Sequence, residues 1–419
     1  MAAVSSLNVT LNRPIGIEDY LVWSTVFSVV LFVPFLPSIQ LGYVIAIANS
    51  ALLLAMNRLS IHRNHLLVIL SIAALSVIGT HAAGVSSSVM FAQLAGIGVM
   101  SVYYFSALTT LDVTLTRWME MYVWFALAVA VVGIVLWPLE QLYDDGRLKS
   151  IYTEPSFYVY VTLPALGYCV GNYLQSRRYG ADILILLLSY VLAKSSLGFL
   201  GLILVAVFTV TPRLRGWQIV GGAIALSVFS GGIYLASGDV RLRVNQMVGA
   251  MISQDLAGVG ASPFAFLSNL YVASQSFAAH PLVGSGIGGY ATLYDRYIGD
   301  ISGFGLAPLL ELELNKYDAN SMILRVAAEL GLPGLIALFG FMIVCARVKG
   351  SPYEQIRNAI LPYLLIRTAR MGAYFTAELY FFVGIYLLNY LNYRKASRKP
   401  SPTMTDLSWP GPEGRPEPV

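Results

Sequence analysis

Six ionisable side chains lie within stretches of sequence that are otherwise apolar. They are Lys194, Arg325, Glu329, Arg367, Arg370 and Glu378. A charge at membrane depth is costly, so a charge that is kept there is a candidate for function. Arg325 and Glu329 stand four residues apart, where an ion pair along one helix face would neutralise both. Either such a structural pair or a role in binding an anion is consistent with this spacing.

Arg367 and Arg370 stand three residues apart and would share one face of a helix. No acidic residue lies close to them in sequence, so their counter-charge must come from elsewhere. It is either Glu378 on the next helix or a phosphate, which the forked guanidinium group binds well. The sequence leaves both alternatives open.

Further charged candidates lie at helix ends and in one long connection. The connection holds Arg241, Arg243, Arg296, Lys316, Asp295, Asp300, Glu311, Glu313 and Asp318. A single charge in a loop is usually only solvated, so a site here requires several of these groups to converge at a pocket. Glu154 precedes Pro155 at the expected start of a helix, where it either complements the helix dipole or takes part in chemistry.

The stretch AAHPLVGSGIGGY, residues 278–290, is rich in glycine and too polar for a membrane helix. Gly284, Gly286 and Gly288 permit positive backbone torsions and close approach. We therefore expect a sharp turn beside a cavity, which would help to place Arg296. His280 has no second histidine or cysteine at ligand spacing, so we predict a structural role for it and no metal site.

The composition indicates an integral membrane protein. The chain has 419 residues, of which 57% are hydrophobic and 11% charged, whereas soluble domains carry about 25% charged residues. The net charge of +4 is spread over short connections, so no nucleic-acid partner is indicated. The two cysteines lie in apolar segments and imply no disulfide framework. We predict an all-α, polytopic fold in contact with membrane lipid.

About twelve membrane helices are expected, since each needs about 20 mostly apolar residues. They cover roughly residues 20–37, 39–56, 65–81, 88–110, 121–139, 157–174, 181–194, 196–211, 217–236, 321–345, 358–374 and 376–393. Lysine and arginine are retained in short cytoplasmic loops, and a cytoplasmic N-terminus places a basic residue in every inside loop. The expected organisation is nine helices in 1–236, a large periplasmic loop with short helices in 237–319, three helices in 320–393 and a disordered cytoplasmic tail in 394–419.

Three stretches in this order resemble the O-antigen ligase and polymerase superfamily of bacterial membrane glycosyltransferases of the GT-C type. HPLVGSGIGGY (280–290) is similar to its HPxxGxGxGxF/Y element, and DANSMILRVAAELGLPGLIALF (318–339) to its HNSxLxxxxELGxxG element. EPSFYVYVTLP (154–164) looks like the EPS element of polysaccharide polymerases. The ordered set is more specific than any one of its members.

The resemblance implies transfer of a glycan from undecaprenyl pyrophosphate at the periplasmic face of the inner membrane, with no metal or cofactor. The acceptor would be another lipid-linked repeat unit in a polymerase, or lipid A-core in a ligase. A chain-length regulator is a partner that this context suggests. A flippase for lipid-linked oligosaccharides is the alternative from another functional class, although the candidate charges gather on the outer side.

On this resemblance, the cationic candidates would hold the pyrophosphate and the carboxylates would serve the acceptor. The first choices for the pyrophosphate are Arg241, Arg243, Arg296, Arg367 and Arg370, and the second choices are Lys194 and Arg325. Asp318 and Glu154 are the acceptor-side candidates. Ala319 stands where ligases carry histidine, and alanine cannot take a proton. This departure and the EPS element favour a polymerase over a ligase.

Overall fold

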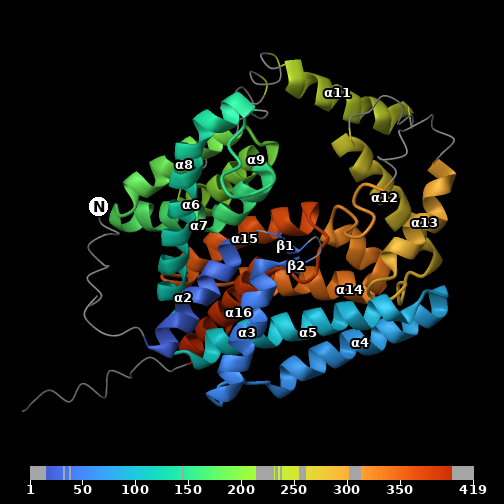
Figure 1. The fold of residues 1–419 in the computed structure, drawn as a ribbon, viewed down its shortest axis with the longest axis horizontal. Coiled ribbons are helices and arrows are strands. Elements are labelled where there is room, and N and C mark those ends of the chain that lie inside the picture. The colour runs from blue at the N-terminus through green and yellow to red at the C-terminus, as the bar shows by residue number, and fades with distance from the viewer. Residues whose placement is uncertain are drawn as a thin grey trace, which may run out of the picture.

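The computed structural model describes residues 16–31, 34–36, 39–143, 146–213, 231, 235, 238–253, 261–301 and 313–398. This part of the chain is helical apart from a short antiparallel ribbon of β1 (Pro34–Leu36) and β2 (Ile39–Gln40). The helices, labelled in Figure 1, are α2 (Ile17–Val30), α3 (Leu41–Ala55), α4 (Arg63–Ala83), α5 (Ser87–Thr110), α6 (Leu115–Tyr143), α7 (Pro155–Ser176), α8 (Gly180–Ala193), α9 (Ser196–Val205), the π-helix η1 (Ala206–Val210), the 3-10 turn η2 (Thr211–Arg213), α11 (Gly238–Ser253), α12 (Ala261–Ala279), α13 (Tyr290–Ile301), α14 (Met322–Ala346), α15 (Tyr353–Arg370) and α16 (Ala377–Arg398).

Four helices of the described chain are long and apolar enough to cross a membrane. They cover Arg63–Ala83, Ser88–Thr110, Leu115–Leu142 and Met322–Ala346. Three shorter apolar stretches cover Leu41–Ala55, Gly180–Ala193 and Ser196–Val210. The all-helical fold and these helices are compatible with a membrane protein, but the expected count of about twelve spans is not confirmed.

The first two expected helices are shorter than their apolar sequences suggest. The helix expected over 20–37 ends at Val30, and the one expected over 39–56 begins at Leu41. Pro34 lies between them in β1, where its ring and missing N–H do not allow a helix to continue. Hydrophobicity alone did not reveal this interruption.

Two other expected helices also differ from the structure. The helix expected over 358–374 ends at Arg370 and is followed by a non-helical segment that contains Gly372. The helix expected over 217–236 falls almost wholly outside the described residues. The described parts of the expected loop 237–319 contain the helices α11, α12 and α13.

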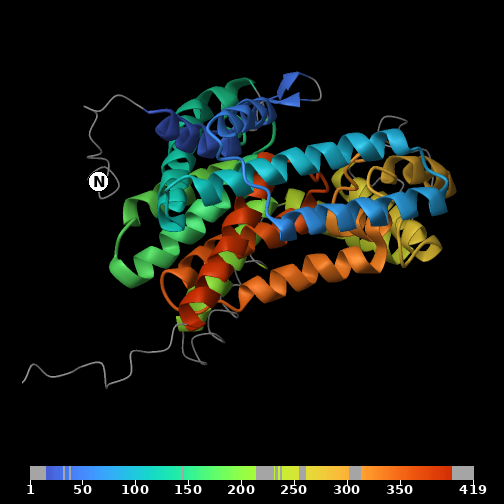
Figure 2. The same cartoon turned by 90° about the horizontal axis from the view of Figure 1, so that it is seen from below.

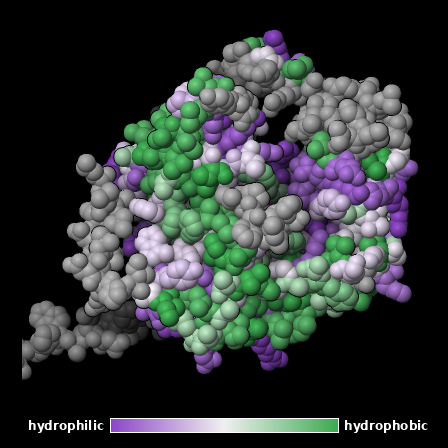
Figure 3. Space-filling model, viewed as in Figure 1, coloured by the Kyte–Doolittle hydropathy of each residue, from purple (hydrophilic) through white to green (hydrophobic). Residues whose placement is uncertain are grey.

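Three long helices, α4, α5 and α14, run side by side, and α12 and α13 lie at one end of them (Figures 1 and 2). α15 packs along α7, and α16 packs against α5. Apolar side chains cover much of the surface in Figure 3, whereas hydrophilic ones gather over α12 and α13. The molecule therefore has one polar end, which the glycine-rich segment and the candidate residues of 313–321 share.

Candidate functional site

The glycine-rich segment 280–289 forms a tight turn between α12 and α13. Gly284, Gly286 and Gly288 have φ angles of 64°, 80° and 82°. Only glycine adopts this region of backbone space at little cost, because it has no Cβ. The positive torsions anticipated from the sequence are therefore present at all three positions.

Helix α14 is broken beside this turn. The backbone at Gly331 is non-helical, with φ 61° and ψ −154°, and Pro333 follows inside the helix. Proline has no N–H, so the carbonyl of Glu329 lacks its usual partner four residues later. The N–H of Leu332 likewise turns away from the carbonyl of Ala328. The break leaves backbone groups that must find partners elsewhere.

The glycine-rich turn supplies these partners. The N–H of Ser285 donates to the carbonyl of Ala328 at 2.9 Å, and the N–H of Gly286 donates to the carbonyl of Glu329 at 2.8 Å. In return, the carbonyl of Pro281 accepts the first N–H beyond the break at 2.8 Å. Broken helices at membrane depth are tolerated where neighbouring protein satisfies their backbone groups. The turn thus complements the break in α14.

This contact leaves no room for side chains. A Cβ at Gly284 would overlap the backbone of Glu329, and a Cβ at Gly331 would lie 2.6 Å from the carbonyl oxygen of Pro281. The two glycine-containing motifs are therefore halves of one structural unit. Their separation in sequence concealed this contact.

The side chain of Glu329 binds the C-terminal part of the turn. Its Oε1 accepts the N–H groups of Gly288 at 3.0 Å and Tyr290 at 3.2 Å. Its Oε2 lies 3.3 Å from Nε of Arg325. Of the two alternatives for this pair, the structure shows the ion pair along one helix face. The carboxylate also holds the start of α13, a contact that the i, i+4 spacing did not indicate.

Arg325 is fully engaged by protein groups. Its Nη1 donates to the carbonyl of Gly372 at 3.0 Å, and its Nη2 donates to Oε1 of Gln93 at 2.6 Å. The guanidinium also lies over the ring of Tyr374, 4.3 Å from its centroid. With 3% of its surface exposed, Arg325 is not available to a ligand in this structure. Its proposed contact with pyrophosphate stays a prediction, and the structure shows only its protein partners.

Arg367 is likewise a structural residue. It is fully buried, donates from Nη2 to the carbonyl of Ala373 at 2.6 Å and to Oγ1 of Thr376 at 3.1 Å, and bonds the carbonyl of Met371. Its Nε lies 3.6 Å from Oε1 of Glu378. Glu378 is therefore its counter-charge, and the candidate role of Arg367 in holding pyrophosphate does not fit this structure.

The segment that contains Asp318 has an unusual backbone. Asn315, Ala319 and Asn320 have positive φ angles of 60°, 58° and 54°, which non-glycine residues adopt at a cost of about 1–2 kcal/mol each. The carboxylate of Asp318 braces the segment, because its Oδ1 accepts Nδ2 of Asn315 at 2.9 Å and the N–H of Asn320 at 3.1 Å. Strain of this kind concentrates at functional sites.

The strained segment lies against the end of α15. Ser321 donates from Oγ to the carbonyl of Thr368 at 3.0 Å. A Cβ at Gly372 would fall on the carbonyl oxygen of Asp318, so the backbones touch there. The Nδ2 of Asn320 is buried and has no hydrogen-bond partner among the described residues. An unsatisfied buried donor calls for a further group or water.

Arg370 is the last residue of α15, and Glu154 directly precedes α7, which packs along α15. Arg370 is half-buried, and none of the described acidic residues lies within ion-pair distance of it. Glu154 is exposed at the first position before α7 and interacts electrostatically with Arg370. Its side chain makes no capping bond to the helix and accepts Oγ of Ser156 at 2.9 Å instead. Two candidates that lie far apart in sequence thus influence each other electrostatically, without forming an ion pair.

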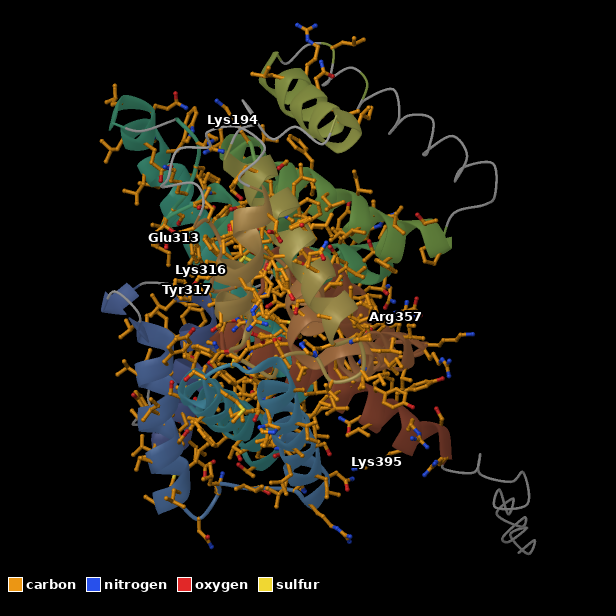
Figure 4. All side chains as sticks on the ribbon, turned by 90° about the vertical axis from the view of Figure 1, so that its right-hand side faces the viewer. Lys194, Glu313, Lys316, Tyr317, Arg357 and Lys395 are labelled. Carbon is orange, nitrogen blue, oxygen red and sulfur yellow. The ribbon has the colours of Figure 1, made fainter. Side chains whose placement is uncertain are left out.

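The other candidates are not joined to this pair by any contact among the described residues. Lys194 is exposed at the end of α8 (Figure 4), and Arg241 is exposed on α11. Arg243 lies on the same helix, but its side chain is outside the described part. Arg296 is exposed on α13 and donates from Nη2 to a backbone carbonyl of α4. His280 follows the last residue of α12, and its backbone carbonyl accepts the N–H of Gly284 in the turn, which suits a structural role.

Lys316 is a further charged residue of the strained segment. Its Nζ lies 2.7 Å from Oδ1 of Asp295 on α13 and 3.6 Å from Oε1 of Glu313. Figure 4 shows Lys316 beside Glu313 and Tyr317. The hydrogen bond with Asp295 raises the pKa of Lys316. These contacts tie α13 to the segment, whereas Glu311 lies outside the described residues.

The arrangement therefore offers one exposed carboxylate and one half-buried guanidinium beside a strained loop. Within the described ranges, no three His, Cys, Asp or Glu side chains are grouped so as to hold a metal ion. Comparison with known proteins gave no match, either to a family model or to a curated protein sequence.

Proposed function

We propose that the protein is a membrane-embedded glycosyltransferase of the polysaccharide polymerase type. It would transfer a glycan from undecaprenyl pyrophosphate to another lipid-linked repeat unit. The observation that carries this proposal is the electrostatic interaction of Glu154 with Arg370, at the end of α15 that the strained segment around Asp318 contacts. The resemblance of three sequence elements, two of which contain Glu154 and Asp318, supports it.

In the proposed reaction, the hydroxyl oxygen of the acceptor sugar attacks the anomeric carbon of the donor. The bond from this carbon to the pyrophosphate oxygen breaks, and its electron pair stays on the pyrophosphate. Arg370 would stabilise that negative charge, because a guanidinium group in a partly desolvated site binds phosphate oxygens strongly. Glu154 would accept the hydroxyl proton and then release it to water.

Of the two acceptor-side carboxylates, Glu154 is the better candidate. Asp318 already accepts two hydrogen bonds that brace its own segment, whereas Glu154 is exposed. Ala319, at the position where ligases carry histidine, is fully buried within a cluster that includes Tyr290 and Tyr294. An acid–base group at position 319 is therefore not part of the mechanism, which favours the polymerase over the ligase.

We further propose a bacterial inner-membrane location, with the site facing the periplasm and both chain ends in the cytoplasm. α4 begins at Arg63 and α14 is followed by Arg347 and Lys349, so basic residues lie at one end of these helices. The turn, α12 and α13 lie at the opposite end (Figures 1 and 2). Because positive charge is retained at cytoplasmic ends, this distribution supports a periplasmic position for the proposed site.

The proposal can be tested by substituting the two central residues. Glu154→Gln keeps the shape but removes the base, so turnover should fall about 10²-fold or more. Arg370→Gln should cost a similar factor by removing charge stabilisation, and Arg370→Lys should retain part of the activity. Arg347→Gln, an exposed change at the other end of α14, is the control and should be neutral.

Glycan length in cells provides the second readout. A strain without the protein should carry single repeat units and no long glycan. A ligase would instead leave long chains on the lipid carrier that never reach lipid A-core, and gel electrophoresis of lipopolysaccharide separates these patterns. Wild-type activity in both Glu154→Gln and Arg370→Gln would refute the proposed site.

A further inference from the structure

Three polar side chains between α15 and α16 each have one buried atom without a hydrogen-bond partner in the described part of the chain. These atoms are Nε of Arg367, the hydroxyl of Tyr363 and Oε2 of Glu378. Each of the three side chains belongs to a residue that is 1% exposed or less. Native proteins rarely leave buried polar atoms unpaired, so three of them in one cluster indicate a further bonding group.

The three side chains form one loosely bonded cluster. Tyr363 and Arg367 stand four residues apart on α15 and share one helix face, and Tyr363 interacts electrostatically with both Arg367 and Glu378. The 3.6 Å between Nε of Arg367 and Oε1 of Glu378 exceeds the length of an N–H···O bond, roughly 2.7–3.2 Å. The hydroxyl of Tyr160 also stands 3.4 Å from this oxygen. Polar contacts of such length are often bridged by water.

The charges of the cluster determine which ligand fits. Nε of Arg367 can only donate a hydrogen bond, an ionised Oε2 of Glu378 can only accept one, and the Tyr363 hydroxyl can do both. Arg367 would repel a cation, and Glu378 would repel an anion. Because these two charges already balance, a charged ligand would lack a counter-charge in a buried place, which is costly. The ligand must therefore be small, neutral and able to donate and accept at once.

We propose that Arg367, Tyr363 and Glu378 enclose an ordered internal water molecule that joins α15 to α16. The water accepts a hydrogen bond from Nε of Arg367, donates one to Oε2 of Glu378 and makes a third with the Tyr363 hydroxyl, as buried waters typically make about three. Arg367 also binds backbone carbonyls between the two helices, so the water helps to fix the connection that contains Gly372. This inference does not depend on the proposed reaction.

Radiolytic labelling detects such a water. A short X-ray pulse converts water into hydroxyl radicals, and a radical that forms inside the protein oxidises the side chain beside it. The full-length protein in detergent micelles is irradiated, digested and analysed by mass spectrometry. Tyr363 should gain oxygen although it is fully buried. Tyr103 is the matched control and should gain none, because it is equally buried but its hydroxyl contacts Thr25 and Asn49.

Heavy-oxygen water distinguishes an enclosed water from bulk solvent. When the pulse directly follows mixing with water enriched in the heavy isotope, the exposed Tyr317 should carry the heavy label at once. Tyr363 should still carry the light isotope and should change to the heavy one only after longer mixing. Equally fast uptake at Tyr363 and Tyr317 would show free entry of solvent and would contradict an ordered water.

A pair of variants tests the role of the carboxylate. Glu378→Met removes the acceptor at similar volume, so the label at Tyr363 should be lost. Glu120→Met is the control and should keep the label, since Glu120 pairs with Arg117 on α6 instead. If Glu378→Met does not fold, the wild-type comparison decides the question. Equal absence of label at Tyr363 and Tyr103 in wild type, or equal labelling of both, would overturn the proposal.

Discussion

Replacing Gly284 by alanine should disrupt the contact between the glycine-rich turn and the broken helix. The new Cβ would overlap the carbonyl group of Glu329 and lie 2.5 Å from the nitrogen of Leu330. These are backbone atoms and cannot swing aside as the end of a flexible side chain would. The turn must therefore move away from α14.

The cost of this change follows from the structure. Alanine at a φ of 64° costs about 1–2 kcal/mol in backbone strain. Displacing the turn also breaks the bonds from Ser285 and Gly286 to the two freed carbonyls of α14, and each buried group left unpaired costs about 1–3 kcal/mol. Together these terms come to about 3–8 kcal/mol, and values above about 4 kcal/mol are exceptional for one substitution.

Unfolding in mixed detergent micelles, followed by tryptophan fluorescence, measures this loss. Gly340→Ala is the matched control, because a Cβ there meets nothing within 4 Å, and it should be neutral or slightly stabilising. Gly288→Ala should fall between, since its φ is 82° but its closest contact is 3.0 Å from a side-chain methyl of Val89. Equal stability of Gly284→Ala and Gly340→Ala would refute the account of the turn.

Three further changes test other contacts. Gly372→Ala places a Cβ on the carbonyl of Asp318, so thermal stability in detergent should fall sharply, and a wild-type melting curve would contradict the packing. Glu329→Gln leaves a buried guanidinium without its counter-charge and should destabilise by about 3–5 kcal/mol, as measured by the same unfolding assay. Lys316→Met removes the ion pair with Asp295 and should lower the free energy of unfolding only slightly, by about 1 kcal/mol or less. Because the Asp295 bond raises the pKa of Lys316 above 10.5, this difference from wild type should be constant below that pH and disappear as pH rises through the raised value.

The helices were largely predictable from the sequence because apolar runs mark them well. α4, α5 and α14 begin and end within a few residues of their expected limits. Errors occurred where a local residue overrides hydrophobicity, as Pro34 does between α2 and α3. The expected count of about twelve spans is not confirmed, because α7 and α15 are long enough but too polar to qualify as membrane helices.

The site was less predictable, because the sequence identifies its charged residues but does not show which of them contact each other. Spacing suggested the Arg325–Glu329 bridge, yet Gln93 and Gly372, which also hold Arg325, carry no sequence signal. Arg367 and Arg370 looked equivalent in sequence, but only Arg370 lies outside a structural network of the described residues. The difference between Arg367 and Arg370 depends on contacts between residues far apart in sequence, and such contacts cannot be derived from one sequence.

Reconstitution tests whether the protein by itself joins lipid-linked repeat units. Purified protein in lipid vesicles is given one defined undecaprenyl-pyrophosphate-linked repeat unit, without nucleotide or other protein, and product length is followed by gel and mass spectrometry. We expect wild type to make a ladder of lipid-linked oligomers, and we expect Glu154→Gln to make none. Absence of any product longer than the starting unit, with the substrate shown to be bound, would contradict it.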